Sequence, residues 1–217
     1  MSFGKYPKYS FMKLFLTIMM TISLTMTGCQ GSFTAAERAI IGTGNDMMPV
    51  MSIENKKDSL LIRKKSKPLT KKDVLSEEFA TLCRRMLKTV RNPENEGVGI
   101  AAPQVGILRR LVAVQRFDKE GEPFEFYINP EIVEYGEPKE YGSEGCLSVP
   151  NHRGEVLRSQ CITLRYRDLQ FKRQTEIIED FTAVIFQHEI DHLDGILYID
   201  RIGDNPNGEL AEGTTGQ

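Results

Sequence analysis

The sequence lacks the features that mark several protein classes. Its 28 basic and 30 acidic residues nearly cancel, leaving a formal net charge of -2, so the composition offers no general argument for a nucleic-acid partner. Its four cysteines show no even spacing that would indicate a disulfide framework, and no internal repeat at a solenoid period is visible. A chain of 217 residues with 40% hydrophobic content is typical of one soluble domain with extensions at both ends.

The apolar run at residues 14–26 is too short to span a bilayer comfortably. Lysines precede it and Cys29 follows it after small residues, an arrangement that resembles a bacterial lipoprotein signal, in which the cysteine is lipidated. Met26 stands where that pattern usually has leucine. We expect residues 1–29 to be a signal-like leader and the protein to be a membrane-anchored lipoprotein. The alternative is translation from near Met47, which would produce a cytoplasmic protein.

The remaining chain divides by composition. Residues 30–46 are polar with glycines and predict a tether, residues 47–202 predict the catalytic domain, and the polar residues 203–217 predict a disordered tail. Residues 56–72 include eight lysines and arginines. No aromatic residues interleave with them for base stacking, which favours a solvated basic face over a nucleic-acid contact.

Two helices flank a region of strands in the predicted order of elements. Residues 76–91 have apolar side chains at i, i+3 and i+4 spacing after the capping residue Ser76, which predicts an amphipathic helix. A second helix is predicted to begin at Asp180 as its cap and to end at Gly195. Between them, strand-like patterns occupy residues 111–115, 124–129, 132–135, 161–166 and 176–179. This order favours an α+β fold.

Histidine is scarce, with 3 in the whole chain, and two of them stand in the motif His-Glu-x-x-His. On a helix this spacing places His188 and His192 on one face, where one metal ion can contact both imidazoles. Glu189 can lie beside the ion and act as a base for an attacking water molecule. The alternative is two ordinary core histidines bonded to backbone carbonyls.

A catalytic metal site typically takes three protein ligands. No further histidine follows His192, as one class of metalloprotease would require. Another class would require a glutamate on a later helix, and Glu209 and Glu212 lie in a tail without helical pattern. Upstream, Cys146 stands between glycine and a turn-forming context, where a thiolate could reach an ion. The alternative for Cys146 is a small buried hydrophobic residue.

Residues 97–104 form a third segment of interest. Its two glycines and small residues allow close approach of a backbone, and Gln104 offers an amide donor that could stabilise an oxyanion.

The three segments together resemble the motifs of the peptide deformylases: Gly-Val-Gly-Ile-Ala-Ala-Pro-Gln, Glu-Gly-Cys-Leu-Ser and Gln-His-Glu-Ile-Asp-His-Leu-Asp-Gly, in that order. The resemblance covers residues 59–202. It implies a compact single α+β domain of mostly antiparallel short sheets packed around a central metal-binding helix. It also implies removal of the N-formyl group from the N-terminal methionine of new polypeptides by a divalent ion, natively Fe²⁺, with Zn²⁺, Ni²⁺ or Co²⁺ as substitutes.

The resemblance also implies roles for individual residues. The metal ligands would be Cys146, His188 and His192, and the general base would be Glu189. The oxyanion would be met by the Gln104 side chain and the Leu147 backbone N–H. The Gly99 backbone would pair with the extended peptide substrate. Val98 and Ile185 would line an apolar pocket for the methionine side chain, and Glu144 and Arg153 would brace the site.

The partners implied are N-formylmethionyl peptides, with no nucleic acid, a possible membrane attachment through lipidated Cys29, and a monomeric state. Two other functions stay open: a metal-dependent peptidase using the same helix, and a non-catalytic protein that binds formyl peptides or stores metal. Glu189 and Gln104 argue against the second, because neither is needed merely to hold an ion.

Overall fold

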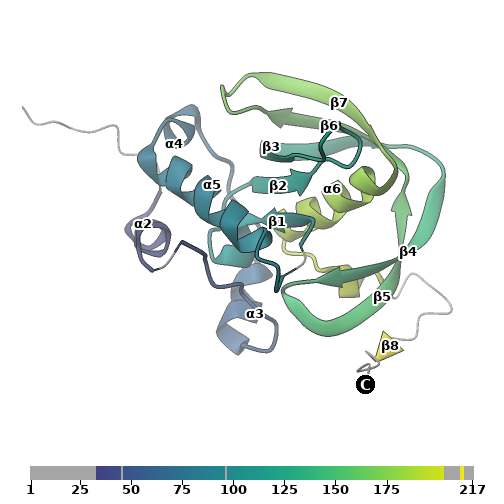
Figure 1. Ribbon diagram of the computed structural model, residues 1–217, viewed down its shortest axis with the longest axis horizontal. Coiled ribbons are helices and arrows are strands. Elements are labelled where there is room, and N and C mark those ends of the chain that lie inside the picture. The colour runs from purple at the N-terminus through teal and green to yellow at the C-terminus, as the bar shows by residue number, and fades with distance from the viewer. Residues whose placement is uncertain (1–32, 45, 96, 203–210, 213–217) are drawn as a thin grey trace, which may run out of the picture. The chain divides into compact units, whose positions relative to one another are not determined.

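The computed structural model describes residues 33–44, 46–95, 97–202 and 211–212 (Figure 1). The predicted leader at 1–29 lies outside these residues, as does most of the predicted tail. Within the described residues, no helix has the length and apolar character needed to cross a bilayer. The helices are α2 (Ala35–Gly42), α3 (Lys56–Ile62), α4 (Lys71–Val74), α5 (Glu77–Val90) and α6 (Asp180–Leu193), with short 3-10 helices η1 (Ala102–Val105) and η2 (Tyr198–Asp200).

The strands form two antiparallel sheets. The larger has five strands in the order β1 (Gly99–Ala101), β2 (Leu111–Gln115), β3 (Phe124–Tyr135), β6 (Cys161–Arg167) and β7 (Arg173–Glu179). The smaller has three strands in the order β4 (Lys139–Cys146), β5 (Val149–Ser159) and β8 (Ala211–Glu212). The predicted α+β class with mostly antiparallel short sheets is confirmed.

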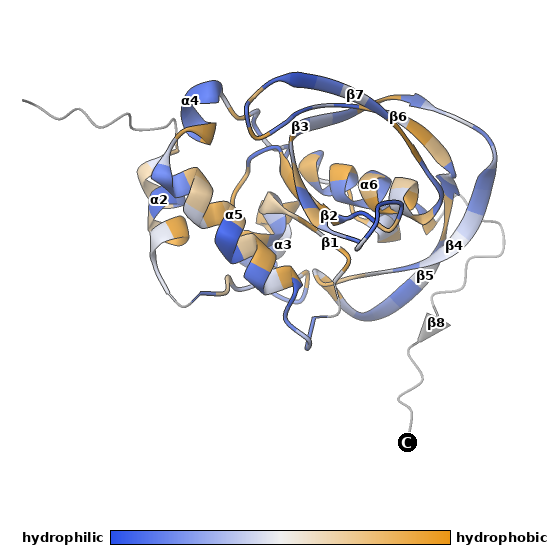
Figure 2. Cartoon of the chain, turned by 45° about the horizontal axis from the view of Figure 1, so that its top comes forward, coloured by the Kyte–Doolittle hydropathy of each residue, from blue (hydrophilic) through white to orange (hydrophobic). Residues whose placement is uncertain are grey.

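The larger sheet is covered on both faces, as the side chains of β2 show. Successive side chains of a strand point to opposite faces. Leu111 and Ala113 pack in one apolar cluster with α5, whereas Val112 and Val114 pack in another with α6. A strand buried on both faces is apolar throughout. Figure 2 shows this as hydrophobic colour on β2 and much of α6, while β7 and much of the β4–β5 hairpin are hydrophilic.

Helix α5 confirms the prediction for residues 76–91. The Ser76 hydroxyl accepts a hydrogen bond from the Phe79 N–H at 3.2 Å, and Phe79, Leu82 and Met86 are buried. In the basic run, all eight lysine and arginine side chains between residues 56 and 72 are exposed.

The predicted tether at 30–46 is wrong for the residues that the structure describes. Helix α2 occupies this stretch and begins with a capping box in which Thr34 and Glu37 bond each other's backbone N–H. Phe33 and Ile41 are buried in the cluster with α5. The Arg85 guanidinium donates to the Ile41 carbonyl at 2.7 Å, so the C-terminal end of α2 is bonded to α5. The stretch is therefore part of the folded domain.

Four further details differ from the sequence prediction. Residues 124–129 and 132–135 form one strand, β3, with a register irregularity near Pro130 instead of a break. The hairpin β4–β5 was not predicted, because residues 139–145 are mostly polar or glycine and lack the typical strand composition.

Asp180 makes no side-chain cap of α6; its N–H donates to the Gln160 carbonyl at 2.7 Å. Two residues of the predicted disordered tail form β8.

The packing of α2 yields a stability prediction. Ile41→Ala should lower the free energy of unfolding by about 2–5 kcal/mol, because it leaves a cavity in a cluster from which Ile41 is only 1% exposed. The matched control is Ile40→Ala on the same helix, where the side chain is 37% exposed and the change should be within about 0.5 kcal/mol. Urea unfolding of both variants measures the difference, and equal values would contradict the packing of α2.

Candidate metal centre

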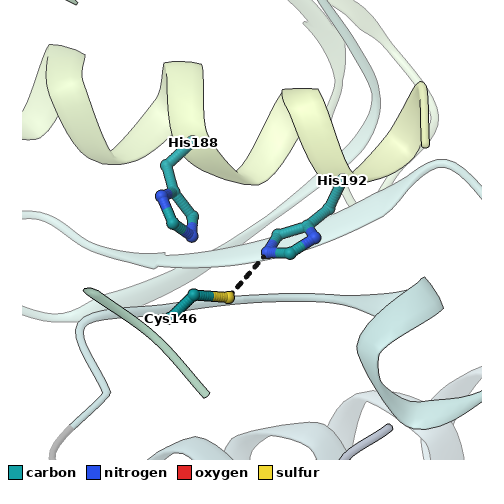
Figure 3. Close-up of side chains that lie close together, drawn as sticks. All are labelled: Cys146, His188 and His192. Carbon is teal, nitrogen blue, oxygen red and sulfur yellow. Dashed lines mark hydrogen bonds between the residues drawn. The ribbon is translucent and has the colours of Figure 1, made fainter. Parts of the chain in front are cut away.

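The two histidines of α6 face a cysteine from the end of β4. Figure 3 shows the imidazoles of His188 and His192 pointing from the helix toward the Cys146 thiol. Their candidate ligand atoms all lie within 4.8 Å of one another, and the distance from Cys146 Sγ to His192 Nε2 is 3.2 Å. The structure thus brings together three predicted ligands from two separate elements.

The turn between β4 and β5 orients the thiol. The strand register shifts between Gly145 and Cys146, so that Cys146 pairs with Val149 across a tight connection. The Ser148 backbone N–H then points to Cys146 Sγ at 3.4 Å. A thiolate accepts such a bond, which helps to hold Sγ toward the histidines.

The electrostatics of this cluster favour the protonation state that a metal requires of sulfur. Burial alone would raise the pKa of the Cys146 thiol, but the charge of His192 and hydrogen bonding with His188 lower that pKa well below its usual value. His192 Nδ1 is buried without a hydrogen-bond partner among the described residues. One thiolate and two imidazoles with an open position are a donor set that suits a divalent transition-metal ion. The residues therefore fit such an ion.

Glu144 on β4 fixes the orientation of His188. The distance from His188 Nδ1 to Glu144 Oε2 is 2.7 Å, which leaves the other ring nitrogen available to a metal. Burial disfavours ionisation of Glu144, but hydrogen bonds from His188 and Arg158 outweigh it and lower the pKa of the carboxyl to about 2. Glu144 is therefore a carboxylate in the folded protein.

Arg153 does not make the predicted brace with Glu144. It is exposed, and the guanidinium that contacts Glu144 belongs to Arg158, with bonds of 2.7 and 3.1 Å. On β5 the residues 154, 156 and 158 are buried whereas 153, 155 and 157 are exposed. This alternation could have identified Arg158 from the sequence if the β4–β5 hairpin had been predicted.

Glu189 lies beside the cluster in a buried position. Its Oε2 has no hydrogen-bond partner within the described part of the chain, and a Cβ added to Gly99 would lie 2.5 Å from its Oε1. Burial raises the pKa of the Glu189 carboxyl to about 7, although the charges of His188 and His192 oppose the rise. A carboxyl group in this state can accept and return a proton near neutral pH.

Gln104 in η1 approaches the same point from the β1 side. Its Oε1 accepts a bond from the Ala101 N–H at 2.8 Å, which turns the amide NH₂ toward Cys146 Sγ at 3.5 Å and Ser148 Oγ at 3.4 Å. Ser148 was not among the predicted site residues, although it belongs to the second motif. The amide donor of Gln104 is thus oriented toward the turn that carries Cys146 and Ser148.

A cleft of about 1160 Å³ opens over these groups. It is lined by Gly99 together with the predicted residues Val98, Leu147 and Ile185. Two apolar residues of α6 that the sequence analysis did not name, Phe181 and Val184, also line it. The cleft therefore combines an apolar wall with the polar cluster, as small-molecule and peptide sites commonly do.

Comparisons with known proteins agree with this geometry. A model of the family described as polypeptide deformylase matches residues 47–207. The peptide deformylase of Desulforudis audaxviator is 42% identical over 154 residues, covering 71% of this chain and 94% of the relative. The crystal structure of peptide deformylase from Thermotoga maritima is 36% identical, with a TM-score of 0.62, over 71% of this chain and 97% of that one.

A class I type b peptide deformylase from Acinetobacter baumannii, in a structure with Met-Ala-Ser bound, is 34% identical, with a TM-score of 0.63, over 71% of this chain and 98% of that one. The matched family model covers well over half of the chain, and the relatives are matched over nearly their full length. On these grounds the chain belongs to the polypeptide deformylase family.

Proposed function

We propose roles for individual residues in this peptide deformylase, a hydrolase that removes the N-formyl group from the N-terminal methionine of newly synthesised polypeptides. Cys146, His188 and His192 hold one divalent metal ion, and Glu189 is the general base. The observation that carries the proposal is the buried Glu189 carboxyl, which has an unpartnered oxygen among the described residues and lies next to three convergent donor atoms. A merely structural carboxyl would be paired.

The metal ion, when bound, supplies Lewis acidity and lowers the pKa of water at the site. We propose Fe²⁺ as the native ion, with Zn²⁺, Ni²⁺ or Co²⁺ as substitutes. The mixed sulfur and nitrogen donor set supports an ion of this group, since thiolate and imidazole suit these ions better than Mg²⁺ or Ca²⁺. The choice of Fe²⁺ within the group rests on the family resemblance.

The protein groups account for both proton transfers. Glu189 takes a proton from the attacking water as its oxygen bonds to the formyl carbon. The oxyanion that develops accepts hydrogen bonds from the Gln104 amide and the Leu147 N–H. Glu189 then returns the proton to the departing amine as the carbon–nitrogen bond breaks, releasing formate and a peptide with a free amino terminus.

The peptide is proposed to lie extended in the cleft. β1 and β4 are edge strands of their sheets, and the cleft is lined by Gly99 of β1 and by several residues of β4, including Gly145. An edge strand offers backbone groups to an added strand. The methionine side chain would enter the apolar wall formed by Val98, Ile185 and their neighbours. The Met-Ala-Ser bound to the Acinetobacter baumannii enzyme supports a peptide as ligand.

We also propose export for the full chain, with residues 1–29 as the leader and Cys29 as the lipidated residue. The sequence pattern of the leader supports it. Its alternative, translation from near Met47, would remove α2, which contributes buried side chains to the core. No role in nucleic-acid binding is proposed, and a monomer stays the expected state.

The base is tested by Glu189→Gln, which keeps the shape of the side chain but cannot accept the proton. Hydrolysis of formyl-Met-Ala-Ser by protein purified anaerobically with Fe²⁺ should fall by about 10²- to 10⁴-fold, while the bound metal content stays at the wild-type level. Glu179→Gln, at an exposed glutamate before α6, is the control and should keep full activity. Loss of the metal from Glu189→Gln would instead make Glu189 a ligand.

The contact between Gly99 and Glu189 gives a second test. Gly99→Ala places a methyl group 2.5 Å from Glu189 Oε1, so the carboxyl must move and kcat/KM should fall by about 10²-fold. Gly42→Ala is the control, because within the described part of the chain no atom beyond its own helix backbone and chain neighbours lies within 4 Å of the added carbon. Unchanged kinetics in Gly99→Ala would show that the position of Glu189 does not limit the reaction.

Localisation is tested by expression of the full chain in a bacterial host with labelled fatty acid. Label should appear in the membrane fraction with the wild type and disappear with Cys29→Ser. A soluble, unlabelled wild-type protein that begins near Met47 would contradict export.

A further inference from the structure

A series of ion pairs connects the metal cluster to the end of the described domain. Arg201 donates through Nε to Asp191 Oδ2 at 2.6 Å, and the same oxygen accepts a bond from Arg158 Nη1 at 2.7 Å. Arg158 Nε then donates to Glu144 Oε1 at 2.7 Å, and Glu144 Oε2 lies 2.7 Å from His188 Nδ1. Four contacts therefore run without a gap from Arg201 to a proposed metal ligand.

The middle of this series is buried. Arg158 is 4% exposed, and Glu144 and Asp191 are each 7% exposed. Two carboxylates out of water need partners of opposite charge, and Arg158 supplies one to both. Because a guanidinium is planar and its donors are rigidly arranged, the position of Arg158 determines the position of both carboxylates. Arg201 contacts Asp191 from the outer side, and its side chain is 37% exposed.

The segment at 197–202 contacts His188 a second way. The Tyr198 ring stacks on the His188 imidazole, with centroids 6.1 Å apart and planes at 21°. Leu197, Tyr198 and Ile202 are themselves buried in an apolar cluster with residues of β5. The segment therefore packs against the core. It contacts His188 directly through the Tyr198 ring and indirectly through the ion pairs that begin at Arg201.

We infer that Arg158 and Arg201 are positioning residues that hold His188 in place for the metal. We also infer that residues 197–202 support this ligand through the Tyr198 ring and the Arg201 ion pair. This inference rests on the metal role proposed for Cys146, His188 and His192. Release of Arg201 frees one side of Asp191, which loosens Arg158 and then Glu144. The His188 ring then samples orientations in which it does not face the ion, and the metal dissociates faster.

The test uses the full chain loaded with Co²⁺, whose absorption bands report the ligand geometry. The dissociation rate is measured as these bands disappear in excess chelator. Arg158→Lys, which keeps the charge but cannot bond two carboxylates in the same way, should raise that rate by about 10- to 100-fold and shift the bands. Arg201→Met should raise it by a smaller factor, at least about threefold.

The matched control is Arg165→Met. The Arg165 side chain is 46% exposed, against 37% for Arg201, and it pairs with Glu131 on β3, outside the segment at 197–202. This variant should lose Co²⁺ at the wild-type rate. Urea unfolding of all three variants separates a general loss of stability from a loss of positioning, because only the latter changes the Co²⁺ bands.

Wild-type rates and bands in both Arg158→Lys and Arg201→Met would overturn the inference while leaving the proposed metal site intact. Equal acceleration in Arg201→Met and Arg165→Met would overturn it as well, because the effect would not depend on Asp191. A wild-type protein that binds no Co²⁺ would refute the proposed metal site and the inference together.

Discussion

The contact between His188 Nδ1 and Glu144 Oε2 joins the two elements that carry the candidate metal ligands. His188 belongs to α6, which packs on the five-stranded sheet, and Glu144 belongs to β4 in the three-stranded sheet. Cys146 follows Glu144 by two residues on β4. The contact that orients one proposed ligand therefore also sets the distance of another from α6. A candidate metal site assembled from a helix and a strand of a different layer depends on such a link, because neither element alone contains three ligands.

The cost of this arrangement is a group of charged side chains inside the protein. Glu144, Arg158 and Asp191 are buried together, and Arg158 forms an ion pair with each of the two carboxylates. Glu189 is the exception, since burial raises the pKa of its carboxyl and one of its oxygens has no partner among the described residues. Structural carboxylates here are ion-paired, whereas the carboxyl proposed for proton transfer is not. In the same buried environment, the basic partners of Glu144 lower the pKa of its carboxyl, whereas burial raises the pKa of the Glu189 carboxyl.

The fold and the site could be predicted from the sequence to different extents. α5 and β2 follow from local periodicity, which is why their predicted bounds agree with the structure to within a residue. The β4–β5 hairpin has polar and glycine residues, and its pairing is decided by the elements around it. The capping box of Thr34 and Glu37 was present in the stretch interpreted as a tether. The polar composition of that stretch was a weaker guide than this spacing.

The sequence by itself determined that His188 and His192 of α6 lie on the same side of the candidate metal site, because helical geometry places residues four apart on one face whatever surrounds the helix. The three motifs also determined the family. Only the tertiary structure decided that Arg158, and not Arg153, pairs with Glu144, that Tyr198 stacks on His188, and that α2 belongs to the core. These contacts join segments that are distant in the chain. No local pattern specifies them, because they depend on how separate elements pack.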